Sequence, residues 1–211
     1  MTARTVKTNN RGRPGHDVDS LLSTAALVFH ERGYDSTSME DLAKRLGITK
    51  SAIYHHVSSK EELLRLTVNR ALDALSAVTE EPESLEGPAI SRLRHALRRS
   101  VRVLVDEQPF VTVLLRLRGN SKVERQALAR RREIDGFLSG LVAAAEREGS
   151  IRPDLDPALT SRLLFGLVNS LIEWYRPRKG LSADELADAV AKLAFEGLEH
   201  QEPSADGEPP R

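Results

Sequence analysis

A short stretch between residues 49 and 60 holds the side chains whose types and spacing are best suited to chemistry. Its first members are small or polar and need no burial, so on a helix in the major groove they could reach the edges of bases. These are Thr49, Lys50, Ser51 and Ala52. Its later members are aromatic or basic and suit contacts with phosphate. These are Tyr54, His55, His56 and Lys60. The stretch therefore favours binding of nucleic acid.

Metal binding and catalysis are the alternatives for this stretch. His55 and His56 are adjacent, so on a helix their side chains point about 100° apart and cannot share one ion. The chain has no cysteine, which excludes a thiolate site. It also has no glycine-rich phosphate loop, nucleophile elbow or metal-binding histidine spacing. We therefore expect no metal, no cofactor and no enzymatic activity.

Apolar spacing and capping residues predict the elements that must position this stretch. Apolar positions from Val18 to Phe29 recur at steps of three and four, which is typical of one helix face. A second helix opens at Thr37 or Ser38, since either residue has an acid three positions later. A third covers residues 49–57. Two short helices that follow a longer one and are joined by a glycine-containing turn form the layout of a helix-turn-helix.

The remainder of the chain also predicts helices. Apolar stripes at helical spacing, with caps and prolines at their ends, indicate helices over 59–78, 88–104, 109–118, 121–148, 157–176 and 182–199. The acidic segment 80–87 is predicted to be a linker. No stretch has the alternation of a strand, and no repeat is visible. The predicted fold class is therefore all-α, with about nine helices.

Composition and charge limit the class of protein. Hydrophobic residues make up 40% of the 211 residues and charged residues 29%, which is ordinary for a globular chain. No apolar run is long enough to span a bilayer, and none follows the basic N-terminus as in a secretory signal. Residues 1–16 carry four Lys or Arg and no acid, so they form either a solvated tail or a nucleic-acid arm. We expect a cytoplasmic protein without a membrane partner.

A family resemblance rests on the stretch from Ala25 to Leu64. Its marks are Phe29 with Arg32–Gly33–Tyr34, Thr37 to Ala43, Gly47–Ile48, Ile53 to Val57 and Ser59 to Leu63. In this combination they resemble the DNA-binding domain of the tetracycline-repressor (TetR) family of bacterial transcription regulators. The resemblance implies a three-helix DNA-binding domain and a helical ligand-binding domain. It also implies a homodimer that forms through the last two long helices, at 157–176 and 182–199.

The resemblance also implies the contacts with operator DNA. It places Thr37 or Ser38 at a helix N-terminus against phosphate. It places three residues at base edges, namely Lys50, Ser51 and Ala52. It places three more on the phosphate backbone, namely Tyr54, His56 and Lys60. The expected organisation is a basic arm at 1–16 that enters a minor groove, a DNA-binding domain at 17–62, a ligand-binding and dimerisation domain at 63–199, and a disordered tail at 200–211.

The effector pocket is expected to be apolar and to lie near arginines. Its expected lining is Leu97, Val101, Leu104, Phe110, Val113, Leu114, Leu117, Phe137, Leu141, Phe165, Asn169 and Trp174, with Arg118 at its edge. Arginines crowd the region at Arg98, Arg99, Arg102, Arg116 and Arg130 to Arg132. They are either solvated or suited to the phosphates of a bulky anionic ligand with an apolar end. An acyl-CoA or aryl-CoA such as phenylacetyl-CoA fits that description.

Residues 151–156 and 173–177 resemble a subgroup of TetR-type repressors of aromatic-acid and steroid-ring catabolism that respond to CoA thioesters. In its steroid-responsive members, charged and aromatic residues contact the ligand at the positions of Phe165 and Asn169 here, so the contact chemistry differs. Two other functions remain open. One is a repressor of a drug-efflux gene with a lipophilic or cationic ligand, and the other is a DNA-binding regulator that answers to a protein partner or to no ligand.

Overall fold

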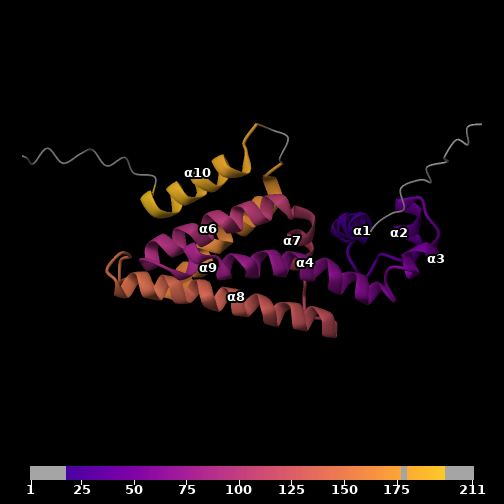
Figure 1. Ribbon diagram of the computed structural model, residues 1–211, viewed down its shortest axis with the longest axis horizontal. Coiled ribbons are helices and arrows are strands. Elements are labelled where there is room, and N and C mark those ends of the chain that lie inside the picture. Colours follow the sequence, from indigo (N-terminus) through magenta and orange to yellow (C-terminus); the bar gives the residue numbers. More distant parts are fainter. Residues whose placement is uncertain (1–17, 177–179, 198–211) are drawn as a thin grey trace, which may run out of the picture. The chain divides into compact units, whose positions relative to one another are not determined.

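The computed structural model describes residues 18–176 and 180–197, and every regular element in that part of the chain is a helix. The helices in chain order are α1 (Val18–Arg32), α2 (Met39–Leu46), α3 (Lys50–Tyr54), α4 (Lys60–Glu80), α5 (Pro82–Leu85), α6 (Ala89–Asp106), α7 (Gln108–Leu115), α8 (Lys122–Arg147), α9 (Pro157–Trp174) and α10 (Ala183–Glu196) (Figure 1). The predicted all-α fold class is confirmed. Within these two ranges, no helix is both long enough and apolar enough to cross a membrane.

The chain divides into two compact units, Met1–Thr67 and Val68–Arg211, which we call the N-terminal unit and the C-terminal unit. The division falls within α4, so this helix contributes residues to both. The predicted arm at 1–16 and tail at 200–211 lie outside the described residues. The predicted domain limits, 17–62 and 63–199, stay predictions.

The N-terminal unit folds around the apolar faces of α1, α2 and α3 and of the start of α4. Leu21, Leu42, Ile53 and Leu63, one from each helix, are at most 1% exposed. Gly47 ends α2 with φ of 67°, a left-handed conformation that glycine adopts without steric cost. The sharp turn that results lets α3 begin three residues later.

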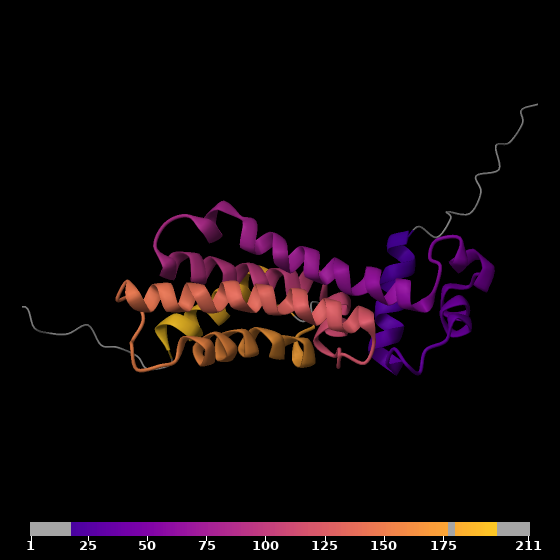
Figure 2. The same cartoon turned by 90° about the horizontal axis from the view of Figure 1, so that it is seen from below.

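The C-terminal unit is a bundle in which α6, α8 and α9 run side by side and α10 lies against α6 (Figures 1 and 2). Its apolar core joins the end of α4 to α6 and α8, through buried residues that include Val78, Leu93, Leu138 and Leu141. Each of these helices is amphipathic in sequence, so packing them together removes their apolar stripes from water.

The structure corrects the predicted number of helices and some of their limits. The segment 80–87, which we expected to be a linker, contains the short helix α5, with Pro82 in its first turn, where a missing N–H costs nothing. α3 ends at Tyr54 instead of continuing to residue 57. The described residues therefore hold ten helices, where about nine were expected.

Candidate DNA interface and effector site

α3 presents almost all of its side chains to solvent. Its N-cap is Thr49, whose hydroxyl accepts a hydrogen bond from the N–H of Ala52 at 3.2 Å. Ile53 is the one buried residue of the helix, and it holds α3 on the core of the N-terminal unit. The exposed side chains in and just after α3 are those of Lys50, Ser51, Tyr54, His55 and His56. All five are among the residues that the sequence predicted for contact with DNA.

The N-terminus of α2 distinguishes between the two predicted caps. Ser38 is the N-cap, because its hydroxyl accepts from the Asp41 N–H at 3.1 Å while the Asp41 carboxylate accepts from the Ser38 N–H at 2.9 Å. Hydrogen bonds from Ser38 lower the pKa of the Asp41 carboxyl. Thr37 is only 2% exposed and donates its hydroxyl to the Gly33 carbonyl at 2.7 Å. Its side chain is therefore not available to phosphate, and we remove it from the predicted contacts.

Lys60 also differs from its predicted role. Its ammonium donates to the carbonyls of Tyr34 at 3.0 Å and Thr37 at 2.9 Å, and it lies 4.3 Å from the centre of the Tyr34 ring. The sequence suggested a phosphate ligand, because a lysine in the first turn of a helix is unfavourable without an anion. The structure supplies another reason, since Lys60 ties the start of α4 to the loop between α1 and α2.

Lys50 is paired inside the protein as well. Its ammonium donates to the carboxylate of Glu40 on α2, and both side chains are largely exposed. The hydrogen bond from Lys50 lowers the pKa of the Glu40 carboxyl. A base contact by Lys50 must therefore compete with this ion pair, which lies in solvent and is weak.

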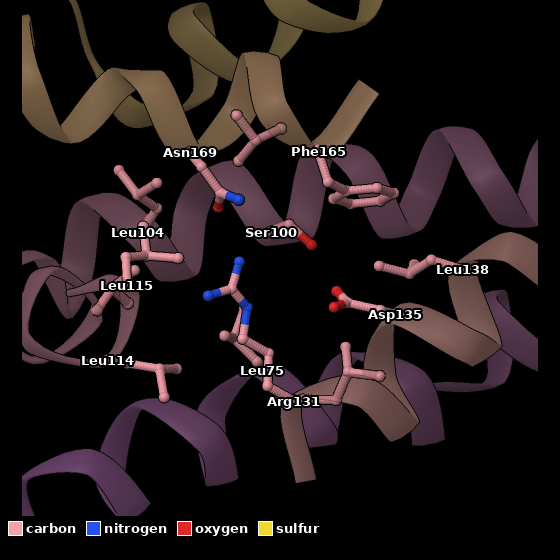
Figure 3. Close-up of a pocket in the computed structure, with 13 residues that line it drawn as sticks. Leu75, Ser100, Leu104, Leu114, Leu115, Arg131, Asp135, Leu138, Phe165 and Asn169 are labelled. Carbon is pink, nitrogen blue, oxygen red and sulfur yellow. The ribbon is translucent and has the colours of Figure 1, made fainter. Parts of the chain in front are cut away.

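The C-terminal unit contains a narrow, mostly apolar cavity of about 50 Å³ between α4, α6, α7, α8 and α9 (Figure 3). Nine of its lining residues are apolar, namely Leu75, Leu104, Val111, Leu114, Leu115, Ile134, Leu138, Phe165 and Val168. The polar ones are Ser100, Arg131, Asp135 and Asn169. A small molecule with an apolar end and polar groups beside that end matches this lining.

A wider groove of about 420 Å³ adjoins the cavity between α8 and α9. It has four lining residues in common with the cavity, namely Arg131, Asp135, Phe165 and Asn169. Two further arginines, Arg132 and Arg162, line the groove. Its walls also include small residues, namely Gly136, Ser139, Ala158, Ser161 and Gly166. The cavity and the groove together form a site with an apolar inner part and a cationic outer part.

Two family profiles match the chain. Residues 21–66 match bacterial regulatory proteins of the tetR family, and residues 86–198, more than half of the chain, match the tetracyclin repressor-like C-terminal domain. The chain belongs to the TetR family of transcriptional regulators. The TetR-like fold predicted from the N-terminal motifs is therefore confirmed.

Three relatives of this TetR-family protein are informative. SCO3833, a TetR-family member from Streptomyces coelicolor A3, is 52% identical, with a TM-score of 0.81 over 85% of this chain and 91% of that chain. AibR, crystallised with isovaleryl coenzyme A and operator DNA, is 26% identical, with a TM-score of 0.70 over 84% of this chain and 97% of that chain. The transcriptional repressor KstR2 of Mycolicibacterium smegmatis is 26% identical over 88% of this chain and 92% of its own length.

The predicted pocket residues of this TetR-family protein separate into two groups. Leu104, Leu114, Phe165 and Asn169 line the cavity. The others do not line it. Leu97, Val101, Val113 and Leu141 are buried in the core, Phe137 packs beside it, and Phe110 lies under the Arg70 guanidinium. Leu117 is half-buried, and Arg118 and Trp174 are exposed. Helical periodicity separates buried from exposed positions, but it does not tell which buried position faces a cavity.

Sequence reasoning missed Leu75, Ser100 and Asp135, which line the cavity from three different helices. Leu75 lies on α4, which supplied none of the predicted lining residues. Ser100 and Asp135 are polar, and a search for an apolar pocket passes over them. An arginine cluster beside an apolar stripe was the available signal for this region, and it pointed to Arg131 and Arg132.

Most of the predicted arginines are occupied by acids of the same unit. Arg98 and Arg102 on α6 pair with Asp188 and Asp184 on α10. Arg99 pairs with Glu81, and Arg130 with Asp73. These four arginines therefore hold helices together and are not free for a ligand. Arg131 and Arg132 instead face the groove, and neither has a hydrogen bond or ion pair with a described residue.

One cluster of the C-terminal unit has the composition of a metal site. Ligand atoms of Glu81, Glu83 and His95 lie within 4.8 Å of one another. However, the guanidinium of Arg99 bonds both carboxylate oxygens of Glu81, at 2.8 and 2.9 Å, and it lowers the pKa of that carboxyl. The arginine already balances the charge of Glu81, so we interpret the cluster as a clamp between the α4–α5 junction and α6.

Proposed function

We propose that this TetR-family regulator is a repressor that binds a pseudo-palindromic operator as a homodimer and is released by an acyl-CoA or aryl-CoA. The observation that carries the proposal is the pairing of a narrow apolar cavity with a groove lined by three arginines. A CoA thioester has the same two parts, an acyl group and a phosphate-rich carrier. Arginine forks suit phosphate oxygens.

On the DNA side, the proposal assigns α3 to the major groove. The proposed contacts are Ser38, Thr49, Lys50, Ser51, Ala52, Tyr54, His55 and His56, of which all but Ala52 are exposed. In a dimer, the two copies of α3 read half-sites about one helical turn apart, roughly 34 Å. The relative AibR, which was crystallised in complex with operator DNA, supports this assignment.

A second copy of this chain is the proposed dimer partner, through α9 and α10. Leu159, Leu163, Gly166, Ser170 and Trp174 on α9 are exposed and recur at steps of four, three, four and four, which is one helix face. Leu163 is 65% exposed and Trp174 is 59% exposed. Large apolar side chains repeated along one face are typical of an interface. Sedimentation equilibrium of the full chain measures the oligomeric state.

Release is proposed to be a shift between two populations. The effector binds better to the conformation that does not fit the operator, and α4 carries the change because it contributes residues to both units. Operator binding that is about 100-fold weaker needs a coupling free energy of roughly 2.7 kcal/mol.

The size of the cavity bears on the acyl group. About 50 Å³ is less than the ~150 Å³ of an apolar cavity known to bind benzene, so a phenyl group requires the lining side chains to move. Short acyl groups require less movement, and the thioester in complex with AibR is isovaleryl coenzyme A. An aryl-CoA such as phenylacetyl-CoA, the ligand suggested by a likeness to repressors of phenylacetic-acid catabolism, remains within the proposal and is one arm of its test.

The alternatives are less well supported by the charges of the site. A cationic drug would be stabilised by acids, but Asp135 is the one acid among the lining residues, against Arg131, Arg132 and Arg162. A regulator that answers only to a protein partner would need no cavity. The apolar cavity, together with the adjoining groove and its three arginines, therefore favours a small anionic effector.

The test is fluorescence anisotropy of the full-length protein on its own upstream DNA. Acetyl-CoA, isovaleryl-CoA, phenylacetyl-CoA, phenylacetate and free CoA are titrated separately. We expect release by at least one thioester and none by phenylacetate or free CoA. Tight DNA binding without release by any thioester would contradict the proposed effector class.

A variant pair tests the groove in the same assay. The double variant Arg131→Ala with Arg162→Ala is expected to need at least tenfold more thioester for release, because two charge-assisted contacts are lost. Its DNA affinity without thioester should stay unchanged. Arg147→Ala, at an exposed arginine that does not line the groove, is the matched control. An equal loss in the control would show a nonspecific charge effect.

A further inference from the structure

Ser100 on α6 carries a hydroxyl that faces the cavity and has no hydrogen-bond partner among the described residues. The residue is 7% exposed and lines the cavity. Figure 3 shows its oxygen directed into the same space as the guanidinium of Arg131 and the carboxylate of Asp135. The hydroxyl is therefore aimed at the place where a ligand would sit.

Other buried hydroxyls of the chain show what is usual. Thr67 donates to the Leu63 carbonyl at 2.8 Å, and Thr112 donates to the Gln108 carbonyl at 2.7 Å. Both bonds run to the carbonyl four residues earlier, which is the common arrangement for a hydroxyl within a helix. Ser100 makes no such bond to the carbonyl of Ala96. The hydroxyl of Ser100 is therefore free to donate into a mostly apolar cavity, and a ligand atom that accepts its proton would be favoured there.

A similar hydroxyl lies in the groove. Ser161 on α9 is 6% exposed, lines the groove together with the arginines, and has no partner among the described residues. Among the described residues, the hydroxyl oxygen of Ser84 is the one side-chain polar atom that is fully enclosed without a partner, and it lies outside both linings. The hydroxyls of Ser100 and Ser161 instead lie along the path from the groove into the cavity.

The division of residues between the cavity and the groove determines which ligand atom meets Ser100. Arg131 and Asp135 belong to both, whereas Ser100 lines only the cavity, as Leu104, Leu114 and Leu115 do. In Figure 3 the guanidinium of Arg131 lies between these leucines and Ser100, and Asp135 lies on the other side of Ser100. A CoA thioester carries several oxygens on the arm between its phosphates and its acyl group. If its phosphates lie among the arginines of the groove and its acyl carbons lie in the cavity, the oxygen that enters the cavity next to the acyl carbons is the thioester carbonyl.

We propose that Ser100 donates a hydrogen bond to the carbonyl oxygen of the effector's thioester and is thereby a specificity-determining residue of this site. The inference rests on the proposed function and adds to it the atom that is recognised. It explains why a polar residue stands on α6 where the other residue that this helix contributes to the lining, Leu104, is apolar. It also distinguishes a thioester from other compounds that carry the same CoA arm.

The experiment compares thioesters with thioethers that lack the carbonyl. Isothermal titration calorimetry of the full chain uses two matched pairs, butyryl-CoA with S-butyl-CoA and phenylacetyl-CoA with S-(2-phenylethyl)-CoA. Ser100→Ala is expected to weaken thioester binding by about fivefold to tenfold, as loss of one hydrogen bond predicts, and to leave thioether binding unchanged. Ser91→Ala, an exposed serine on the same helix, is the control and should change neither.

The outcomes separate this inference from the proposed function. If Ser100→Ala weakens thioester and thioether equally, or weakens neither, the inference is wrong while the effector class stands. If no CoA compound binds the unaltered protein, the proposed function and the inference both fail.

Thermal denaturation gives a second readout. Ser100→Ala should leave Tm unchanged or higher, because it removes a hydroxyl without a partner. A fall in Tm together with equal losses for both compounds would show that Ser100 acts in packing, which overturns the inference.

Discussion

The α2–α3 pair and the effector site present opposite ways of building a site. In the N-terminal unit, all the proposed contacts except Ser38 lie within residues 49–56, and a single buried residue, Ile53, anchors the helix that carries most of them. In the C-terminal unit, the cavity takes residues from five helices that are as far apart in sequence as Leu75 and Asn169. The first site depends on local order. The second exists only when the bundle is assembled.

The largest effect is expected from a change in the core of the N-terminal unit, which should abolish one site and leave the other intact. Ile53→Ala removes the one buried side chain of α3 and should destabilise this unit by about 2–4 kcal/mol. Operator binding should be lost, while thioester binding by the C-terminal unit, measured by calorimetry, should remain. Ser51→Ala, on the exposed face of the same helix, controls for the loss of a side chain and should leave stability unchanged. Loss of thioester binding in Ile53→Ala would contradict the separation.

A substitution of Lys60 tests whether its ammonium binds DNA or stabilises the N-terminal unit. Because the ammonium holds the carbonyls of Tyr34 and Thr37, Lys60→Ala should lower the free energy of unfolding by about 1–2 kcal/mol. The dependence of log K for operator binding on log salt should keep its slope. If the slope instead becomes smaller by the amount expected for one lost phosphate contact, Lys60 contacts the phosphate backbone.

Glu124 provides a pH-dependent perturbation of the C-terminal unit alone. Burial raises the pKa of its carboxyl, but hydrogen bonds from the N–H groups of Arg118, Gly119 and Asn120 outweigh burial, so the pKa is lowered. A lowered pKa contributes stability that is present above the unfolded value, about 4.5, and is lost as pH falls through the folded value. Glu124→Gln should therefore lower stability at pH 7 by about 1–3 kcal/mol.

The measurement is denaturant unfolding between pH 3 and 7. The difference between the unaltered protein and Glu124→Gln should shrink as the carboxylate of the unaltered protein takes up its proton. A difference that stays constant down to pH 3 would show that the carboxylate charge is not the source of the stability.

The smallest expected effect concerns the ion pair between Lys50 and Glu40. Glu40→Gln removes an exposed acid beside the proposed base contacts and releases Lys50. Operator affinity should rise about twofold to threefold at low salt, and the gain should diminish as salt screens the charges. Glu31→Gln, which releases the exposed Arg45 in the same unit, is the matched control. Weaker binding by Glu40→Gln would show that Glu40 orients Lys50 for its contact.

The helices of the N-terminal unit could be predicted closely because their signals are local. Capping residues, apolar spacing and the motif from Phe29 to Leu63 determine three helices and their exposed faces within one stretch. The errors there, at Thr37 and Lys60, concern contacts that close a loop through the carbonyls of Gly33 and Tyr34. A sequence pattern does not show which side chain a carbonyl will attract.

The effector site was predicted less well, for a physical reason. Leu97 and Leu104 lie on the same helix and are both almost completely buried, yet Leu104 lines the cavity and Leu97 does not. Likewise, Arg130 pairs with Asp73 while its neighbour Arg131 faces the cavity and the groove. Such distinctions depend on how helices cross, and amphipathic patterning leaves those crossings open.

By itself, the sequence determined the all-α class, the helix-turn-helix, the TetR family and an apolar pocket beside arginines, because periodicity, caps and local motifs act over a few turns of chain. Only the tertiary structure decided which arginines form ion pairs with Asp188, Asp184, Glu81 and Asp73, and which ones face the groove. It also decided that the hydroxyl of Ser100 points into the cavity without a partner. Whether a charge or a hydroxyl is free for a ligand depends on what distant helices bring beside it.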